Sequence, residues 1–236
     1  MCNTCNCASK NGLCARNILI FSSLSDDELL KIVNMTEHKN IEENDVLCRE
    51  GEESDKLFLI REGKVKICKL TKDGKEQIVY ILSKGDFFGE NNVFVENTLS
   101  NFSAYALTEG KVCILNKKDL DEILLNNPKI SIKIIQEMAK RITSAENLAQ
   151  NLATKDVEVR VATMLVEFMY KYGHENEEGV KILLPLNREQ MANYCGLTRE
   201  TVSRKLSKFD KLGVIELKGN KIIFVKDKEY LLNLAE

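Results

Sequence analysis

The sequence is poor in the residues and runs that would indicate a histidine-bound metal or a membrane span. It has only two histidines, His38 and His174, far apart in the chain. A zinc site built on histidine is therefore not expected. No apolar run approaches the roughly 18 residues of a membrane span, and no basic N-terminal segment is followed by a hydrophobic one. We therefore expect a cytoplasmic protein with no membrane partner.

Catalytic motifs are also missing. We find no nucleophile–base pair, no metalloprotease motif and no Gly-rich phosphate loop. A thiol oxidoreductase using Cys2 and Cys5 is disfavoured, because such enzymes place C-x-x-C at the start of a helix that follows a strand, and no strand is indicated there. We expect no enzyme. The 236 residues, 44% of them hydrophobic, suffice for one large or two ordinary domains with packed cores.

The stretch from Leu186 to Ile215 indicates two short helices. Its apolar residues mostly recur at three- and four-residue steps, and Gly196 interrupts the pattern. Thr198, followed by Glu200, supplies an N-cap hydroxyl and an acidic first turn for a second helix. Two helices joined by a glycine turn predict a helix-turn-helix, whose second helix enters the DNA major groove.

The second helix presents side chains suited to reading bases. Arginine donates to guanine, glutamate accepts from cytosine, and serine is adaptable. From Leu186 to Lys226 we count nine basic against four acidic residues, which favours contacts with phosphates. An ordinary αα-hairpin with a solvated charged face is the alternative. The β-rich runs Val214–Leu217 and Ile222–Val225 weaken it, because they form a hairpin placed as a wing would be. The predicted DNA contacts are Arg188, Thr198, Arg199, Glu200, Ser203, Arg204 and Lys205.

The region from Asn44 to Leu115 indicates a β domain. Short β-rich runs alternate apolar and polar residues between turns, at a spacing typical of an antiparallel sandwich or barrel. The turn glycines, 12, 11 and 11 residues apart, are Gly51, Gly63, Gly74 and Gly85.

A long helix is expected after Asn127-Pro128. Its apolar positions step by three and four residues, as in a two-stranded seam. One face of a helix against the β domain is the alternative, but helix-turn-helix readers usually bind as dimers. The seam residues are Ile135, Met138, Ile142, Ala145, Ala149 and Leu152. Residues 153–156 are the expected hinge.

Four of the eight cysteines crowd the first fourteen residues, a segment that cannot bury enough apolar surface to fold alone. Thiolates on one metal centre would supply the ordering energy. Cys48, Cys68 and Cys195 lie in apolar or helical patterns, and we assign them to the core. The N-terminal group is Cys2, Cys5, Cys7 and Cys14.

The motif GLTRETVSRKL resembles the recognition helix of the bacterial family that includes the cyclic AMP receptor protein and the fumarate and nitrate reduction regulator. The chain from about Ile18 onward is similar to that family without large gaps. Glu200, Ser203 and Arg204 resemble the second member's reading residues, which implies a palindromic TTGA-like site. The resemblance also implies a β-roll, a homodimer and RNA polymerase as a partner.

Two features place the chain nearer the second member. Phe88, Gly89 and Glu90 keep the first half of a nucleotide phosphate cassette, so a carboxylate for a ribose hydroxyl is available. Phe102 stands where the phosphate-binding arginine would be, and no other cation lies between Glu90 and Ala104. Burying a phosphodiester without a cation is costly. We therefore do not expect cyclic AMP to bind.

The fumarate and nitrate reduction regulator holds a [4Fe-4S] cluster through three N-terminal cysteines and a fourth on a roll strand, in a segment resembling ALTEGKVCIL. The resemblance implies Cys113 as that fourth ligand. The family spacing C-x2-C-x5-C is not kept here. We favour Cys5 and Cys14, with Cys2 or Cys7 as the third ligand. A cluster or zinc held by all four N-terminal thiols, with Cys113 in the core, is the alternative.

The predicted architecture is α+β, with four parts: a Cys-rich segment (1–17), a cyclic-nucleotide-binding-like β-roll (18–126), a dimerisation helix (127–154) and a winged helix-turn-helix domain (155–236). We interpret the protein as a dimeric transcription regulator that senses oxygen, nitric oxide or redox state through the cluster. A haem-based nitric oxide sensor is one rival. A regulator with a zinc- or thiol-stapled N-terminus and an organic ligand in the roll is another.

Overall fold

The computed structural model describes residues 14–22, 24–95, 99–153, 156–177 and 179–235, apart from the side chain of Cys14. The chain divides into two compact units. The first comprises Met1–Lys69 and Val79–Ile142, and the second comprises Leu70–Ile78 and Thr143–Glu236. None of the described helices is both long and apolar enough to cross a membrane. The expected hinge lies partly outside the described residues.

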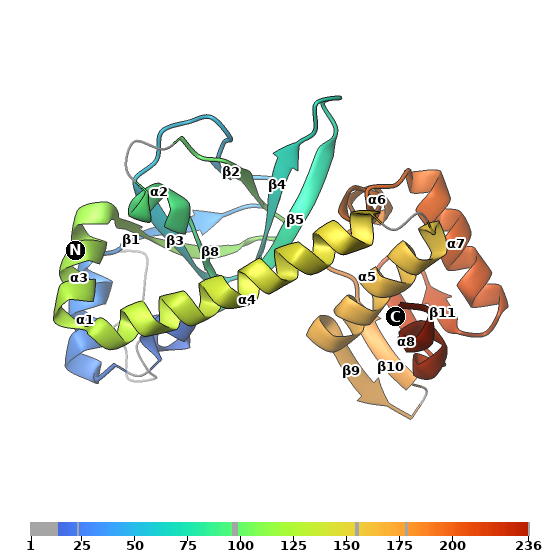
Figure 1. Ribbon diagram of the computed structural model, residues 1–236. Helices are drawn as coiled ribbons and strands as arrows, with labels where there is room; N and C mark the ends of the chain where they lie inside the picture. The colour runs from blue at the N-terminus through green and yellow to red at the C-terminus, as the bar shows by residue number, and fades with distance from the viewer. Residues whose placement is uncertain (1–13, 23, 96–98, 154–155, 178, 236) are drawn as a thin grey trace. The chain divides into compact units, whose positions relative to one another are not determined.

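The described part of the first unit begins with two short 3-10 turns, η1 and η2, and ends at Ile142 within the long helix α4 (Figure 1). Between them lie three helices and eight strands. The elements are η1 (Cys14–Asn17), η2 (Leu19–Phe21), α1 (Asp26–Met35), β1 (Glu37–Ile41), β2 (Val46–Cys48), β3 (Lys56–Glu62), β4 (Lys64–Leu70), β5 (Glu76–Ser83), β6 (Phe87–Phe88), α2 (Glu90–Phe94), β7 (Ser103–Ala106), β8 (Gly110–Asn116), α3 (Lys117–Asn126) and α4 (Pro128–Ala153).

The strands form two four-stranded sheets, in the orders β1-β8-β3-β6 and β2-β7-β4-β5. Side chains from both sheets meet in one buried cluster, among them Ile60, Ile67 and Val112, so the sheets pack face to face. This arrangement confirms the predicted β-roll. All four glycines predicted to make its turns have positive φ.

A second buried cluster covers the other face of the β1-β8-β3-β6 sheet. There Leu59, Cys113 and Leu115 pack with residues of η1, η2, α1, α3 and α4. The alternation along β8 follows from the pleat, because neighbouring side chains point to opposite faces of a sheet. Cys113 therefore faces the helices and the N-terminal turns, and not the interior between the sheets.

Helix α1 begins at a capping box. The Ser25 hydroxyl accepts a hydrogen bond from the Glu28 backbone N–H, and the Glu28 side chain accepts one from the Ser25 N–H. This capping box satisfies two N–H groups that the first helical turn leaves unpaired. It sets the position of α1 and of the strand β1 that follows it.

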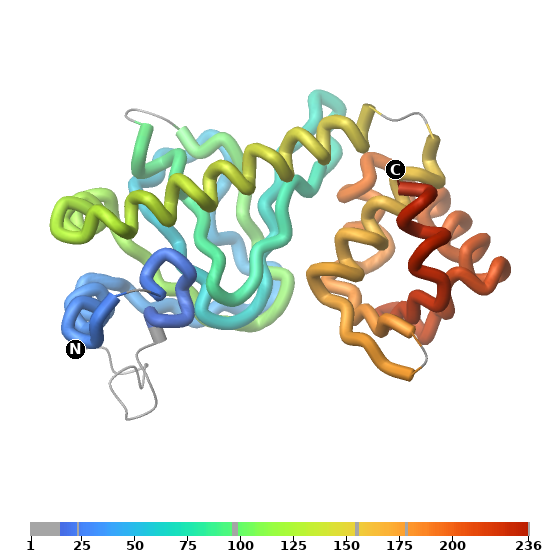
Figure 2. Tube along the Cα trace, turned by 60° about the horizontal axis from the view of Figure 1, so that its bottom comes forward, coloured from blue at the N-terminus to red at the C-terminus, as the bar shows by residue number. Residues whose placement is uncertain are grey.

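The second unit is a helix-turn-helix framed by a sheet and two further helices. Its elements are α5 (Val157–Tyr172), β9 (Gly173–Asn176), β10 (Gly179–Leu183), α6 (Arg188–Cys195), α7 (Arg199–Lys211), β11 (Ile215–Lys218), β12 (Ile222–Val225) and α8 (Lys228–Ala235). Helix α8 lies alongside α5 (Figure 2). The sheet has the order β11-β12-β10-β9. The wing hairpin pairs through β12 with β10, and β10 pairs with β9; the sequence pattern indicated neither β10 nor β9.

Candidate nucleic-acid interface and sensor sites

The turn between α6 and α7 is defined by a cap on each side. Helix α6 starts at a capping box between Asn187 and Gln190, and it ends at Gly196, whose φ of 64° lies in the left-handed region. Glycine adopts this conformation without strain, since it has no Cβ. The Thr198 hydroxyl then accepts from the Thr201 N–H and caps α7. The structure therefore contains the helix, turn and capped second helix that the sequence predicts.

Helix α7 buries one face completely and leaves the opposite face open. The side chains of Val202, Leu206 and Phe209 have 0% exposure. Arg199, Glu200 and Arg204 are exposed, as is the N-cap threonine, and Ser203 is half-buried. Among the ion pairs of the described residues, none involves Glu200 or Arg204. These groups are therefore available to an external partner, although they stand one helical turn apart and could have paired.

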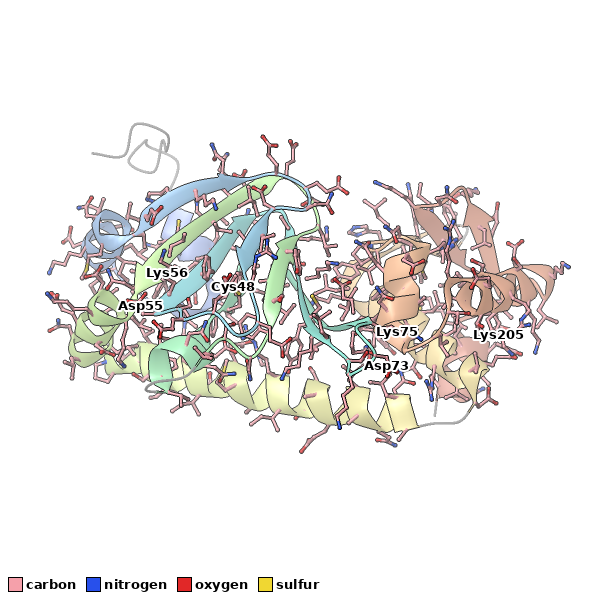
Figure 3. All side chains as sticks on the ribbon, turned by 90° about the horizontal axis from the view of Figure 1, so that it is seen from above. Cys48, Asp55, Lys56, Asp73, Lys75 and Lys205 are labelled. Carbon is pink, nitrogen blue, oxygen red and sulfur yellow. The ribbon has the colours of Figure 1, made fainter. Side chains whose placement is uncertain are left out.

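Two of the predicted DNA-contacting side chains, Lys205 and Arg188, are partly buried and make contacts within the protein. The Lys205 Nζ lies 2.8 Å from Glu158 Oε2 on α5, and the Lys205 side chain is 22% exposed (Figure 3). Lys208 binds the same carboxylate at 2.7 Å. The hydrogen bonds from both lysines lower the pKa of Glu158. Arg188 is half-buried, with Nη1 3.3 Å from the Met191 sulfur. Lys205 thus ties α7 to α5, a role that its place in the motif did not suggest.

The wing carries its cations close to an aromatic ring. Lys218 Nζ lies 4.3 Å and Lys226 Nζ 5.4 Å from the centroid of the Phe224 ring. Both ammonium groups also lie near the Glu216 carboxylate, at 3.5 and 3.1 Å. Glu216 therefore offsets part of the positive charge of the wing lysines.

In the roll, the carboxylate expected for a ribose is already engaged. Glu90 Oε1 lies 2.7 Å from Arg141 Nη1, and the two side chains are only 13% and 17% exposed. The Arg141 guanidinium also donates to the Phe87 carbonyl and lies over the Phe87 ring, 4.6 Å from its centroid. One oxygen of the carboxylate expected for a ribose hydroxyl is therefore paired with a cation from α4, and not with one from the cassette itself.

The position of the missing cassette arginine is filled by aromatic packing. Phe102 is 7% exposed and belongs to the cluster between the two sheets. Its ring meets Phe88 edge to face with centroids 6.3 Å apart, and Phe88 stacks on Phe58 at 4.6 Å. An apolar lining of this kind offers no donor to a phosphate.

Three cysteines occupy the core, as predicted. Cys48, Cys68 and Cys195 are 8%, 3% and 0% exposed, and Cys48 lies on β2 in the roll (Figure 3). Burial raises the pKa of Cys48 to about 11 and that of Cys195 to about 12. Burial in apolar surroundings and a raised pKa are typical of structural cysteines.

Cys113 differs from these three in its surroundings. It is 5% exposed, yet its Sγ lies 3.0 Å from Nδ1 of His38 on the neighbouring strand. Ala15, next in the chain to Cys14, lies in the same buried cluster. Within the described residues, no three His, Cys, Asp or Glu side chains form a metal-binding group. Cys2, Cys5 and Cys7 lie outside those residues, so the predicted ligand set has only Cys113 described in full.

The predicted dimer seam on α4 is largely open. Ile135 is 67% and Ile142 61% exposed, and Ala149 is also exposed. Ala145 and Leu152 are partly covered. Met138 packs instead against the buried cluster of its own protomer. Two large apolar side chains one heptad apart on an open helix face are what a partner helix would cover.

Two family models match the chain. One, a cyclic nucleotide-binding domain, matches residues 38–127, and the other, a Crp-like helix-turn-helix domain, matches residues 159–234. Electron transport regulator A of Shewanella oneidensis is 32% identical over 213 residues, which cover 90% of this chain and 84% of the relative. The chain belongs to the Crp/Fnr family of bacterial transcription regulators.

Other members of the Crp/Fnr family extend this result. The anaerobic regulatory protein of Bacillus subtilis is 28% identical over 211 residues, 89% of each chain. A solved CooA mutant from Carboxydothermus hydrogenoformans matches 93% of this chain and 96% of its own, with a TM-score of 0.80 and 23% identity; this likeness shows the fold. Crp/Fnr regulators bind DNA and function as dimers, and these relatives are regulators, not enzymes.

Proposed function

We propose that this Crp/Fnr regulator senses oxygen, nitric oxide or redox state through an iron–sulfur cluster, held by Cys113 and three N-terminal cysteines. Cys5 and Cys14 are two of these, and Cys2 or Cys7 is the third. When bound, such a cluster supplies a site that oxidants and nitric oxide attack. Relatives named as anaerobic and electron transport regulators support this assignment.

The observation that carries the proposal is the location of Cys113. Its side chain faces the N-terminal turns, and it shares a buried cluster with Ala15, the residue after Cys14. A ligand on β8 can therefore tie the N-terminal segment to the sheet and to the first turns of α4, which contribute Ile130 and Ile134 to that cluster. Loss of the ligand would free the segment and loosen the base of the dimer helix.

The cluster is tested by anaerobic purification with iron and sulfide assays. We expect roughly four irons per protomer in the wild type, loss of iron in Cys113→Ser, and retention in Cys48→Ser, the matched buried cysteine of the same unit. Operator binding is then measured before and after air. A colourless, iron-free wild type that binds DNA equally in both states contradicts the proposal.

We also propose the chemistry by which α7 reads DNA. Arg204 and Glu200, exposed and one turn apart, can donate to guanine and accept from cytosine in one half-site. Together with Ser203 they suit a palindromic TTGA-like sequence. The test is a set of duplexes in which each base pair of the half-site is replaced in turn. Equal affinity for all of them would contradict direct reading by these side chains.

We propose that the homodimer forms through the open face of α4. Replacing Ile135 and Ile142 by lysine should convert the dimer to a monomer, measured by analytical ultracentrifugation. Leu125→Lys is the matched control, since that side chain is 84% exposed but lies on α3. Dimers that survive the double replacement would contradict this seam. RNA polymerase is the expected partner at the promoter.

A further inference from the structure

His38 and Cys113 form a contact that no part of the proposed function uses. The two residues are direct partners in the β1–β8 register. Because cross-strand partners carry their side chains on one face of the sheet, the imidazole and the thiol meet, with Sγ and Nδ1 3.0 Å apart. His38 is half-buried and Cys113 is 5% exposed. The contact therefore lies at the edge of the buried cluster that contains the N-terminal turns.

The neighbours of the ring indicate which nitrogen carries the proton. The Thr36 hydroxyl donates to the Val33 carbonyl at 2.9 Å. With its proton used, Thr36 Oγ1 can only accept from His38 Nε2, 3.4 Å away. On the other side Arg61 Nη1 lies 3.5 Å from Nδ1, and arginine only donates. Nε2 is therefore the protonated nitrogen, and Nδ1 is an acceptor with one lone pair. The Cys113 S–H, with Sγ at 3.0 Å, lies closer to it than Arg61 Nη1 at 3.5 Å and is its donor.

We propose that His38 is the positioning residue of Cys113, holding its sulfur through Nδ1 on the sheet face against which the N-terminal turns pack. In the iron-free protein Nδ1 accepts from the thiol. When Cys113 binds iron as a thiolate, the thiol proton is released to solvent and the Nδ1–H tautomer of the neutral ring donates to the sulfur. The inference rests on the proposed role of Cys113 as a metal ligand. Groups that orient a metal ligand in this way affect metal affinity about 10-fold to 100-fold. The other buried cysteines of the roll have different partners, since Cys48 Sγ contacts the Ser100 hydroxyl and the Phe102 carbonyl.

The contact itself is tested by nitrogen-15 NMR of the histidine side chains in iron-free protein. The chain has two histidines, and exposed His174 serves as the internal control. We expect His38 in the Nε2–H tautomer, with an Nδ1 resonance that shifts in Cys113→Ala while that of His174 does not. An Nδ1–H tautomer in the iron-free protein, or a His38 Nδ1 resonance that does not shift in Cys113→Ala, overturns the inference.

The positioning role is tested by iron uptake in two variants. His38→Asn places an amide near the position of Nδ1, whereas His38→Gln places it near Nε2. We expect His38→Gln to take up iron about 10-fold more weakly and His38→Asn to stay within about twofold of wild type, at equal melting temperature. Equal losses in both variants overturn the role. If wild type itself takes up no iron, the proposed function fails and the NMR result alone decides the contact.

Discussion

The protein contains two sets of one glutamate and one arginine that differ in burial and in pairing. In the roll, Glu90 and Arg141 are bonded at 2.7 Å and nearly buried. On the recognition helix, Glu200 and Arg204 stand one turn apart and exposed, and neither is among the ion-paired side chains of the described chain. The first set is paired inside the protein. The second leaves its donors and acceptor for a ligand, as base reading requires.

Solvent accounts for the difference. An exposed ion pair is stabilised by only about 0–1 kcal/mol, because water and salt screen it and ordering two long side chains costs entropy. A buried pair must stay together, since separating it leaves a charge without water or partner. In Glu90 even the paired carboxylate has one buried oxygen, Oε2, without a hydrogen-bond partner.

The largest effect should come from breaking the closed pair. Arg141→Met keeps the side-chain volume but leaves the Glu90 carboxylate buried alone, so we expect the first unit to lose about 3–5 kcal/mol of stability. The double variant Glu90→Gln with Arg141→Met should recover most of it. Urea denaturation followed by circular dichroism measures both. If the double variant is no more stable than Arg141→Met, the pair does not act as a closed unit.

Removing one member of the open set should affect DNA binding and leave stability unchanged. Arg204→Ala should weaken binding to the TTGA-like palindrome by about 1–3 kcal/mol, but weaken binding to a scrambled duplex much less. Lys211→Ala, exposed at the far end of α7, is the matched control. Fluorescence anisotropy at fixed salt measures the affinities. A uniform loss across both duplexes would indicate a phosphate contact instead.

The open set also depends on the cap that starts its helix. Thr198→Ala removes the acceptor of the Thr201 N–H and should cost the second unit about 1 kcal/mol. Ser207→Ala, an exposed hydroxyl in the same helix, should be close to neutral. Thermal unfolding measures the melting temperatures of the two variants, and we expect that of Thr198→Ala to be lower. Equal melting temperatures would show that Gly196 and the packing of α7 suffice to position the helix.

The smallest effect concerns Glu158, the carboxylate that holds Lys205 and Lys208. Its pKa is lowered from 4.5 by their hydrogen bonds, so its contribution to stability is present above the unfolded pKa and is lost as the pH falls through the folded pKa. Glu158→Gln should therefore flatten the fall in melting temperature below about pH 4.5. An unchanged slope would mean that the lysines do not stabilise this carboxylate.

The sequence predicted the open set and not the closed one for a physical reason. Caps, glycine turns and helical periodicity are local features. The start of α7 and its exposed residues could therefore be predicted from about a dozen neighbouring residues. Glu90 and Arg141 are 51 residues apart, and Cys113 and His38 are 75 apart. Their contacts depend on strand register and on where α4 crosses the roll, which no local pattern encodes. Strand β9, with the polar sequence GHEN, was missed because it lacks an alternating apolar face.

The strand order of the second unit has one more consequence. Strands β11 and β9 are the two edge strands of its sheet. An unprotected edge strand can pair through its backbone with another copy of the protein. Both are four residues long and carry charges, among them Glu216, Lys218 and Glu175. Short, charged edge strands disfavour such pairing. The two edges of this sheet are therefore protected against aggregation by strand pairing.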